Sequence, residues 1–176
     1  TGSFTSPILN FGSISLSNIS SSTFSDIFVV KYDPNGTVLW AKRKGDSSSD
    51  EGLGIVTEGS GNVYVTGHFR SSSITFGSTV LINTAFPSDD IFTVKYDANG
   101  NYVYAKRIGG TGSDQGKIIE VDGNGNVYVM GNYNGTVDFN PGEGVSNLTG
   151  SNNRFFSKYD ANGNYVYAIN MQLKDD

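Results

Sequence analysis

The sequence has no cysteine and a single histidine, His68, among its 176 residues. The absence of cysteine excludes a disulfide framework, cysteine-based zinc sites and thiol catalysis. One histidine also excludes a histidine-rich metal site built from this chain alone. No apolar run approaches the ~20 residues that a membrane-spanning helix needs, so the sequence predicts no membrane insertion.

Charged residues are also scarce. They make up 16% of the chain, and their formal sum at pH 7 is −5. A protein that binds nucleic acid through its phosphates needs a basic surface, so we expect no nucleic-acid partner. An acidic surface also disfavours docking on anionic lipid.

The abundant residues are those of turns and strands. The chain has 23 Gly, 22 Ser and 18 Asn, while Tyr, Phe, Val, Thr and Ile supply most of its apolar content. Aromatic and β-branched residues favour strands, and Gly and Asn favour tight turns. The composition therefore predicts an all-β fold made of many short strands.

A repeat runs through the chain with a spacing of 63 to 65 residues. The motif Asp-Ile-Phe-x-Val-Lys-Tyr-Asp begins at Asp26 and again at Asp90, and a shortened form begins at Arg154. Recurrence in register indicates that each copy is one structural unit. An Asn-Gly pair follows each copy, at residues 35–36, 99–100 and 162–163.

The residue pattern of each unit predicts four strands and an inserted hairpin. In the third unit the first two strands are expected at 116–122 and 126–131, and residues 38–43 are typical of a fourth strand. The middle unit carries its insert at 74–83. Apolar residues occur on both faces of the strands, so both faces of each sheet should be covered. Four-stranded antiparallel sheets stacked in this way describe β-propeller blades, and a β-solenoid-like stack is the alternative.

Several segments resemble the bacterial SBBP-type beta-propeller repeat. They are residues 109–114, residues 121–129 and the Asp-Ile-Phe-x-x-Lys-Tyr-Asp-x-Asn-Gly motif, and residues 137–142 are similar to inserts of such repeats. The resemblance covers nearly the whole chain. It implies a secreted or surface-exposed bacterial protein, hence an extracellular location. The family is defined by its fold and brings no common catalytic motif, so we expect no enzymatic activity.

The chain should hold about two and three quarter blades of ~64 residues. The expected units are an incomplete first blade at 1–43, a second blade at 44–107, and a third blade with a C-terminal strand at 108–176. Closed propellers need roughly 4 to 8 blades. Three explanations stay open: a fragment of a larger propeller or propeller enzyme, a subunit that closes a ring with copies of itself, and a head-to-tail polymer.

The two ends carry the residues expected to mediate assembly. A blade short of one strand has an open edge that pairs readily with a partner strand. The segment 168–173 departs from the Ala-Lys-Arg of the other units. It is either an ordinary outer strand or a strand donated to a neighbouring copy. The residues assigned to this contact are Thr1, Phe4, Ile169, Met171 and Leu173.

Aromatic residues share one position of the fourth strand, as Trp40, Tyr104 and Tyr167. Exposed rings stack on sugars, so a glycan or ligand site that also uses His68 is one hypothesis. The favoured alternative is that the rings pack against the next blade. A lone imidazole is likewise more often a surface or hydrogen-bonded residue than a catalyst.

Four Asp turns with the pattern Asp-x-Asn-Gly resemble oxygen-rich calcium loops. Calcium takes 6 to 8 oxygens, and these turns lack the bidentate Glu that follows in such loops. Asp followed by Asn-Gly is also what a tight turn requires, and this interpretation is favoured. We expect no cofactor, and the weak candidates for Ca²⁺ ligands are Asp33, Asp97, Asp122 and Asp160.

Carboxylates that recur in every unit indicate a structural role, because an active site is built once per propeller. Residues that break the repeat are therefore more informative. An enzyme formed by several chains would need Glu58, Asp89 or Glu143 to converge in a central pocket. The full set that breaks the repeat is Glu51, Glu58, His68, Arg70, Asp89, Asp138, Glu143 and Arg154.

Overall fold

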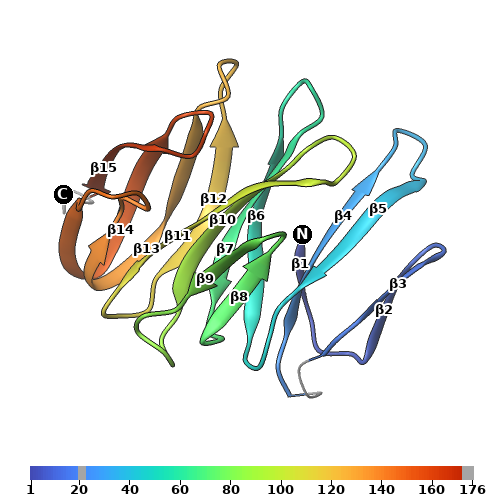
Figure 1. Ribbon diagram of the computed structural model, residues 1–176, viewed down its shortest axis with the longest axis horizontal. Helices are drawn as coiled ribbons and strands as arrows, with labels where there is room; N and C mark the ends of the chain where they lie inside the picture. The colour runs from blue at the N-terminus through green and yellow to red at the C-terminus, as the bar shows by residue number, and fades with distance from the viewer. Residues whose placement is uncertain (20–22, 172–176) are drawn as a thin grey trace, which may run out of the picture.

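The computed structural model describes residues 1–19 and 23–171, and all fifteen regular elements in these ranges are β-strands. The prediction of an all-β fold made of antiparallel blades is confirmed. Figure 1 shows the sheets standing side by side in chain order, from the blue N-terminal strands to the red C-terminal ones. Neither described range contains a helix that could cross a membrane.

The first blade has three strands in the order β1-β4-β5. β1 pairs antiparallel with β4, and no strand in the described ranges pairs with the other edge of β1. A separate hairpin, β2-β3, is inserted between β1 and β4. The bounds are β1 Gly2–Phe4, β2 Ile8–Phe11, β3 Ile14–Ser17, β4 Asp26–Tyr32 and β5 Val38–Lys44.

The second blade has four strands in the order β6-β7-β10-β11. The expected hairpin is present as β8-β9, between the second and third strands of the blade. β6 is the first strand of this blade, and β11 is its last. The bounds are β6 Asp50–Thr57, β7 Val63–Phe69, β8 Ser73–Phe76, β9 Thr79–Ile82, β10 Asp90–Tyr96 and β11 Tyr102–Gly110.

The third blade consists of β12, β13, β14 and β15, and the pairing of β11 with the end of β13 joins it to the second blade in one eight-stranded sheet. Its insert differs from the other two. The second strand was expected to end at 131, but β13 continues to Asp138, and its 12 residues pair with the 13-residue β14. The insert therefore extends the blade itself, with an irregularity between Tyr133 and Gly135. The bounds are β12 Gln115–Val121, β13 Val127–Asp138, β14 Asn147–Tyr159 and β15 Tyr165–Met171.

Two hydrophobic cores lie between the blades. Val63 and Val65 of β7 belong to the core against the first blade, whereas Tyr64 between them belongs to the core against the third. Side chains alternate between the two faces of a strand, so a strand that is apolar throughout contributes to both cores. The second blade is thus covered on both faces.

Candidate functional site: the joints between blades

The contact between neighbouring blades is built twice in the same way. We call the contact of the first and second blades the first joint, and that of the second and third blades the second joint. At the first joint, a Cβ on Gly52 of β6 would overlap Oγ1 of Thr1. At the second joint, a Cβ on Gly116 of β12 would overlap Oγ1 of Thr66. Only glycine lets the first strand of one blade approach the preceding blade this closely.

The two threonines are satisfied within their own blades. Thr1 Oγ1 donates to Phe28 O at 2.8 Å, and Thr66 Oγ1 donates to Phe92 O at 2.9 Å. A buried hydroxyl without such a partner would destabilise the joint. Thr1 therefore lies in the first joint. Phe4 is buried in the first blade.

Aromatic side chains form the outer half of each joint. At the first joint, a Cβ on Gly100 would lie 2.9 Å from Cδ2 of Trp40, whose Nε1 donates to Ala98 O at 3.3 Å. At the second, a Cβ on Gly163 would lie 3.0 Å from Cε2 of Tyr104. Both glycines are buried turn residues with positive φ, 82° and 77°. Trp40 and Tyr104 thus each hold the turn of the following blade.

The third aromatic residue of this set, Tyr167, has no blade against it in the described structure. It is 39% exposed and contacts Phe156 of its own blade, with ring centroids 6.2 Å apart. At the opposite end of the molecule, Gly36 occupies the turn position of Gly100 and has the same φ of 82°. A Cβ on Gly36 would meet nothing within 4 Å. Each end therefore presents one half of the outer contact.

The corner before each first strand is fixed by a buried aspartate. The amide of Asp50 donates to Ser25 O, and that of Asp114 donates to Asp89 O, both at 2.8 Å. Each of these bonds ties a blade to the one before it. Burial raises the pKa of Asp50 to about 6 and that of Asp114 to about 7.

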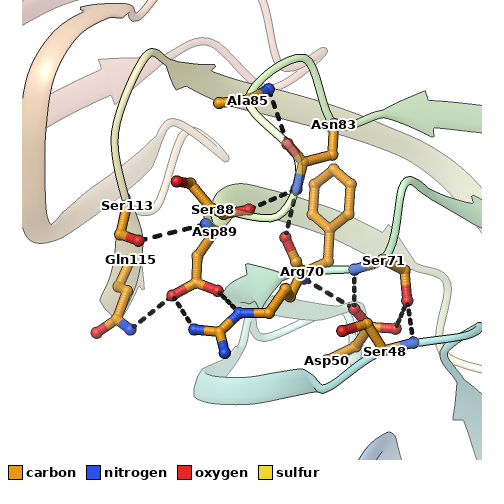
Figure 2. Close-up of polar contacts among 11 residues, drawn as sticks. Ser48, Asp50, Arg70, Ser71, Asn83, Ala85, Ser88, Asp89, Ser113 and Gln115 are labelled. Carbon is orange, nitrogen blue, oxygen red and sulfur yellow. Dashed lines mark hydrogen bonds and ion pairs between the residues drawn. The ribbon is translucent and has the colours of Figure 1, made fainter.

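The same carboxylates hold the corner of their own blade. Oδ1 of Asp50 accepts the amides of Arg70 at 3.0 Å and Ser71 at 3.1 Å, and Oδ2 accepts the Ser71 hydroxyl at 2.8 Å, as Figure 2 shows. Asp114 accepts the amide of Asn134 in the third blade and that of Gly110 at the end of β11. These donors favour the ionised form of each aspartate, so they lower its pKa and oppose the effect of burial. The corner aspartate is therefore a structural residue that recurs.

Four residues that break the repeat lie together at the second joint with Gln115 of β12; they are Glu51, His68, Arg70 and Asp89. Arg70 Nε donates to Asp89 Oδ1 at 2.9 Å, and Gln115 of β12 contacts Asp89 Oδ2 at 3.4 Å (Figure 2). His68 lies in β7, paired with Glu51 of β6. Sequence reasoning singled out these positions, but it did not place them together and it missed Gln115. Gln115 could have been found from the sequence, because the second unit has Glu51 at the same position.

His68 is 7% exposed, and its Nδ1 has no partner among the described residues. Burial lowers the pKa of this imidazole, while Asp89 and Glu51 act in the opposite direction. The positive charges of Arg70 and Lys117 also lower the pKa of His68. The geometry describes a neutral histidine enclosed in a joint.

The acids that a multi-chain enzyme would require lie in separate surroundings. Glu58 follows β6 and accepts the Ser60 and Tyr64 hydroxyls. Asp89 lies near the opposite end of β6, so Glu58 and Asp89 are separated by about 25 Å along the strand. Glu143 is exposed in the insert of the third blade. Nothing in this arrangement forms a pair of carboxylates for acid–base chemistry.

The four turn aspartates use their oxygens within their own turns. Oδ1 of Asp97 accepts the amides of Asn99 at 2.9 Å and Asn101 at 2.7 Å, and its Oδ2 accepts the Asn101 side chain at 2.8 Å. Hydrogen bonds of this kind lower the pKa of Asp97, and they lower that of Asp122 to about 2. Across residues 1–19 and 23–171, no three acidic or histidine side chains group around a metal position. Asp122 and Asp160 make the same contacts in their turns, and Asp33 accepts the two matching backbone amides.

The candidate assembly residues at the C-terminal end belong to β15. Ile169 and Met171 pair with Phe156 and Arg154 of β14 and are 51% and 43% exposed. They complete the third blade and form part of its uncovered side. Leu173 lies outside the described residues.

We call this uncovered side the open face. A cavity of about 350 Å³ is hollowed into it. Two cations, Lys117 and Arg154, line the cavity together with apolar side chains. The exposed or half-buried members of the open face are Ile118, Met130, Phe156, Tyr167, Ile169 and Met171.

Residues 103–137, which run from β11 into β13, match the family model described as the SBBP beta-propeller repeat. The chain is 32% identical over 111 residues, or 61% of its length, to an uncharacterized WD repeat-containing protein of Acanthamoeba polyphaga mimivirus. It is 28% identical over 141 residues, or 80% of its length, to the regulatory protein FlaEY of Caulobacter vibrioides. The matched regions span 8% and 14% of these two relatives.

Proposed function

We propose that this beta-propeller repeat protein is a non-enzymatic structural and adhesive scaffold outside the cell. It self-associates by stacking the first blade of one copy on the third blade of another. The observation that carries the proposal is that the two ends hold opposite halves of a contact that the molecule already uses twice. A contact between two different faces is heterologous, so it produces a ring where it closes and a filament where it does not.

The open face corresponds to the side of the second blade that is buried in the second joint. Ile108 of β11 is 1% exposed, and Met171 at the matching position of β15 is 43% exposed. Tyr104 packs on Gly163, and Tyr167 is its unpaired counterpart. Burying such apolar side chains contributes roughly 1.5–3 kcal/mol each, which offsets the cost of association.

The first blade offers the complementary side. Tyr32 of β4 is 47% exposed, while its counterpart Tyr96 in the second blade is 1% exposed. At the first joint, Lys31 Nζ donates to Ala98 O at 3.0 Å. The matching groups at the two ends are Lys158 and the carbonyl of Pro34, so the proposed contact forms the same bond between copies.

The non-enzymatic role is supported by the separation of Glu58, Asp89 and Glu143. The adhesive and extracellular parts of the proposal are supported by the resemblance of the repeat to bacterial surface propellers. Low charge and turn-rich blades fit a scaffold that works through its surfaces.

Sedimentation analysis over a range of concentrations, with electron microscopy of the same samples, tests the proposal. We expect rings or filaments whose amount rises with concentration and falls in the Tyr167→Asp variant. Val145→Asp is the matched control, because Val145 is 75% exposed in the insert and lies outside both joints. A monodisperse monomer at every concentration would refute self-association.

A further inference from the structure

The outer edge of β11, the last strand of the second blade, is paired over only part of its length. Its inner edge pairs with β10 from Ile108 to Tyr102, whereas its outer edge pairs with β13 only at Gly109 and Gly110. No other described strand pairs with this outer edge, which lies between the second and third blades. An edge of this kind presents amides and carbonyls to a strand of another chain.

Alternation along the strand identifies the backbone groups that face outwards. The amide of Thr111, just beyond β11, donates to Thr136 O at 3.2 Å. Successive residues of a strand direct their backbone groups to opposite edges, so Ala105 and Arg107 face the same side as Thr111. Neither has a described strand beside it on that side. Two pairs of backbone donors and acceptors are therefore open to an added strand.

The unpaired part of the edge lies on the floor of a groove of about 750 Å³. One wall is the β8-β9 hairpin, which contributes residues 78–82 and 84, and the other is the loop after β13, which contributes Asn140, Pro141 and Gly142. This volume is within the range of pockets that hold small ligands, roughly 300–1,000 Å³. The groove thus has room for a short extended segment beside β11.

The hairpin side of the groove is apolar. Val80 and Ile82 of β9 are 53% and 55% exposed, Val103 of β11 is 49% exposed, and all three line the groove. Ala105 packs in the same core as the hairpin, so the side chains of Ala105 and Arg107 point to this side. Residues of an added strand opposite these two would share their face. Apolar side chains at both positions would cover the exposed residues of β9.

The other face of β11 carries a cation without an ion-pair partner. Lys106 lies between Ala105 and Arg107 and points towards the third blade, where a Cβ on Gly163 would lie 3.2 Å from its Cε. Among the described residues, no carboxylate forms an ion pair with its ammonium, although its charge acts at longer range on Asp160. An acidic residue opposite Lys106 would form a cross-strand ion pair with it.

The carboxylate of Asp138 also lines the groove but lies further along the edge. Asp138 pairs with Gly109, three residues beyond Lys106, which is about 10 Å along the strand. Its Oδ1 accepts the amides of Asn140 at 3.0 Å and Ser146 at 2.8 Å. An acidic residue opposite Lys106 would therefore be close to the ammonium and distant from this carboxylate.

We infer that the outer edge of β11 binds an extended segment of another protein with the pattern apolar-acidic-apolar. The segment pairs antiparallel with β11, in line with the end of β13. Its acidic residue lies opposite Lys106, and its apolar residues lie opposite Ala105 and Arg107. The groove is outside the two faces that stack in the proposed self-association, so this inference goes beyond that function and can hold without it.

The test uses the whole chain and the fluorescent, end-capped peptide Ser-Thr-Val-Glu-Val-Thr-Ser. We expect saturable binding by fluorescence anisotropy and slower hydrogen exchange at the amides of Ala105 and Arg107. A peptide with Lys in place of Glu should bind about tenfold more weakly, because it places a like charge opposite Lys106. A peptide with both valine amides N-methylated should not bind, because those amides are the donors that pair with the edge.

A charge swap in the protein provides the second arm. Lys106→Glu should weaken binding of the Glu peptide about tenfold and strengthen binding of the Lys peptide, a reversal that a misfolded variant would not show. Ile82→Asp should weaken binding of the Glu peptide, because it places a charge in the apolar wall. Val145→Asp is the matched control and should bind normally, because Val145 is 75% exposed and does not line the groove.

Three results would overturn the inference. They are no binding of the Glu peptide, equal binding of the N-methylated peptide, and an unchanged preference between the two charged peptides in Lys106→Glu. Sedimentation of the peptide-free protein reports separately on self-association, so a failure of one idea is distinguishable from a failure of the other.

Discussion

The second and third blades have the same four-stranded arrangement, but they differ in how many of their faces are covered. The second blade is packed on both faces, and Asp90 and Arg107 form an ion pair at 2.5 Å in which the carboxylate is fully buried. The third blade is packed on one face, and the matching positions are the neutral Asn153 and Asn170. A buried carboxylate requires a partner, whereas a neutral amide tolerates a half-open site. The first blade is also packed on one face but keeps the pair as Arg43 and Asp26, 2.8 Å apart, so the loss of this ion pair is particular to the third blade.

The largest expected effect contrasts an aromatic residue in a joint with its counterpart on the open face. Trp40→Ala should lower the free energy of unfolding by about 3–5 kcal/mol, because Trp40 is 8% exposed and fills the first joint. Tyr167→Ala should lower it by less than ~1 kcal/mol. Urea unfolding at low protein concentration measures both. Equal losses would mean that the joint contributes no packing beyond that of the open face.

A smaller effect is expected for two glycines with the same backbone conformation. Gly36 and Gly100 both have φ of 82°, so alanine at either costs ~1–2 kcal/mol for the left-handed conformation. Gly100→Ala should cost a further ~1–3 kcal/mol because its Cβ would lie 2.9 Å from the ring of Trp40. Thermal and urea unfolding of the two variants give the difference. A larger loss for Gly36→Ala would contradict an open first-blade turn.

The smallest effect concerns the pH dependence of the second joint. Burial raises the pKa of Asp114 to about 7, so its proton stabilises the fold at low pH and this contribution is lost as pH rises towards 7. We expect a loss of roughly 1–2 kcal/mol over this pH range. The amides of Gly110 and Asn134 favour the anion and already limit how far burial raises the pKa. Asp114→Asn should remove this dependence in unfolding measurements between pH 4 and 8.

His68 contributes with the opposite sign at the same joint. Its pKa is lowered by burial, so its contribution is present above the ordinary value and is lost as pH falls through the lowered one. His68→Asn introduces the residue of the third blade, Asn132, and should reduce the loss of stability on acidification. If the variant loses as much stability on acidification as the unmodified protein does, the imidazole is not enclosed as described.

Much of the fold follows from patterns in the sequence. The residues expected as a strand at 116–122 correspond to β12, and the insert expected at 74–83 forms β8-β9. The extension of β13 to Asp138 was not predicted, because the Asn-Gly pair at 134–135 favours a turn, whereas the strand continues through it with an irregularity. The polar cluster of Arg70, Asp89 and Gln115 was not predicted either, since its members come from two blades.

The sequence by itself determined the repeat, the all-β class and the turns, because alternation of apolar residues and Asn-Gly pairs act over a few neighbouring positions. Only the tertiary structure decided which copies of a repeated residue are buried. Trp40 and Tyr167 share a position in the repeat, but one has a turn against it and the other is exposed. Burial depends on the neighbour across a joint, which lies a whole repeat away in the chain.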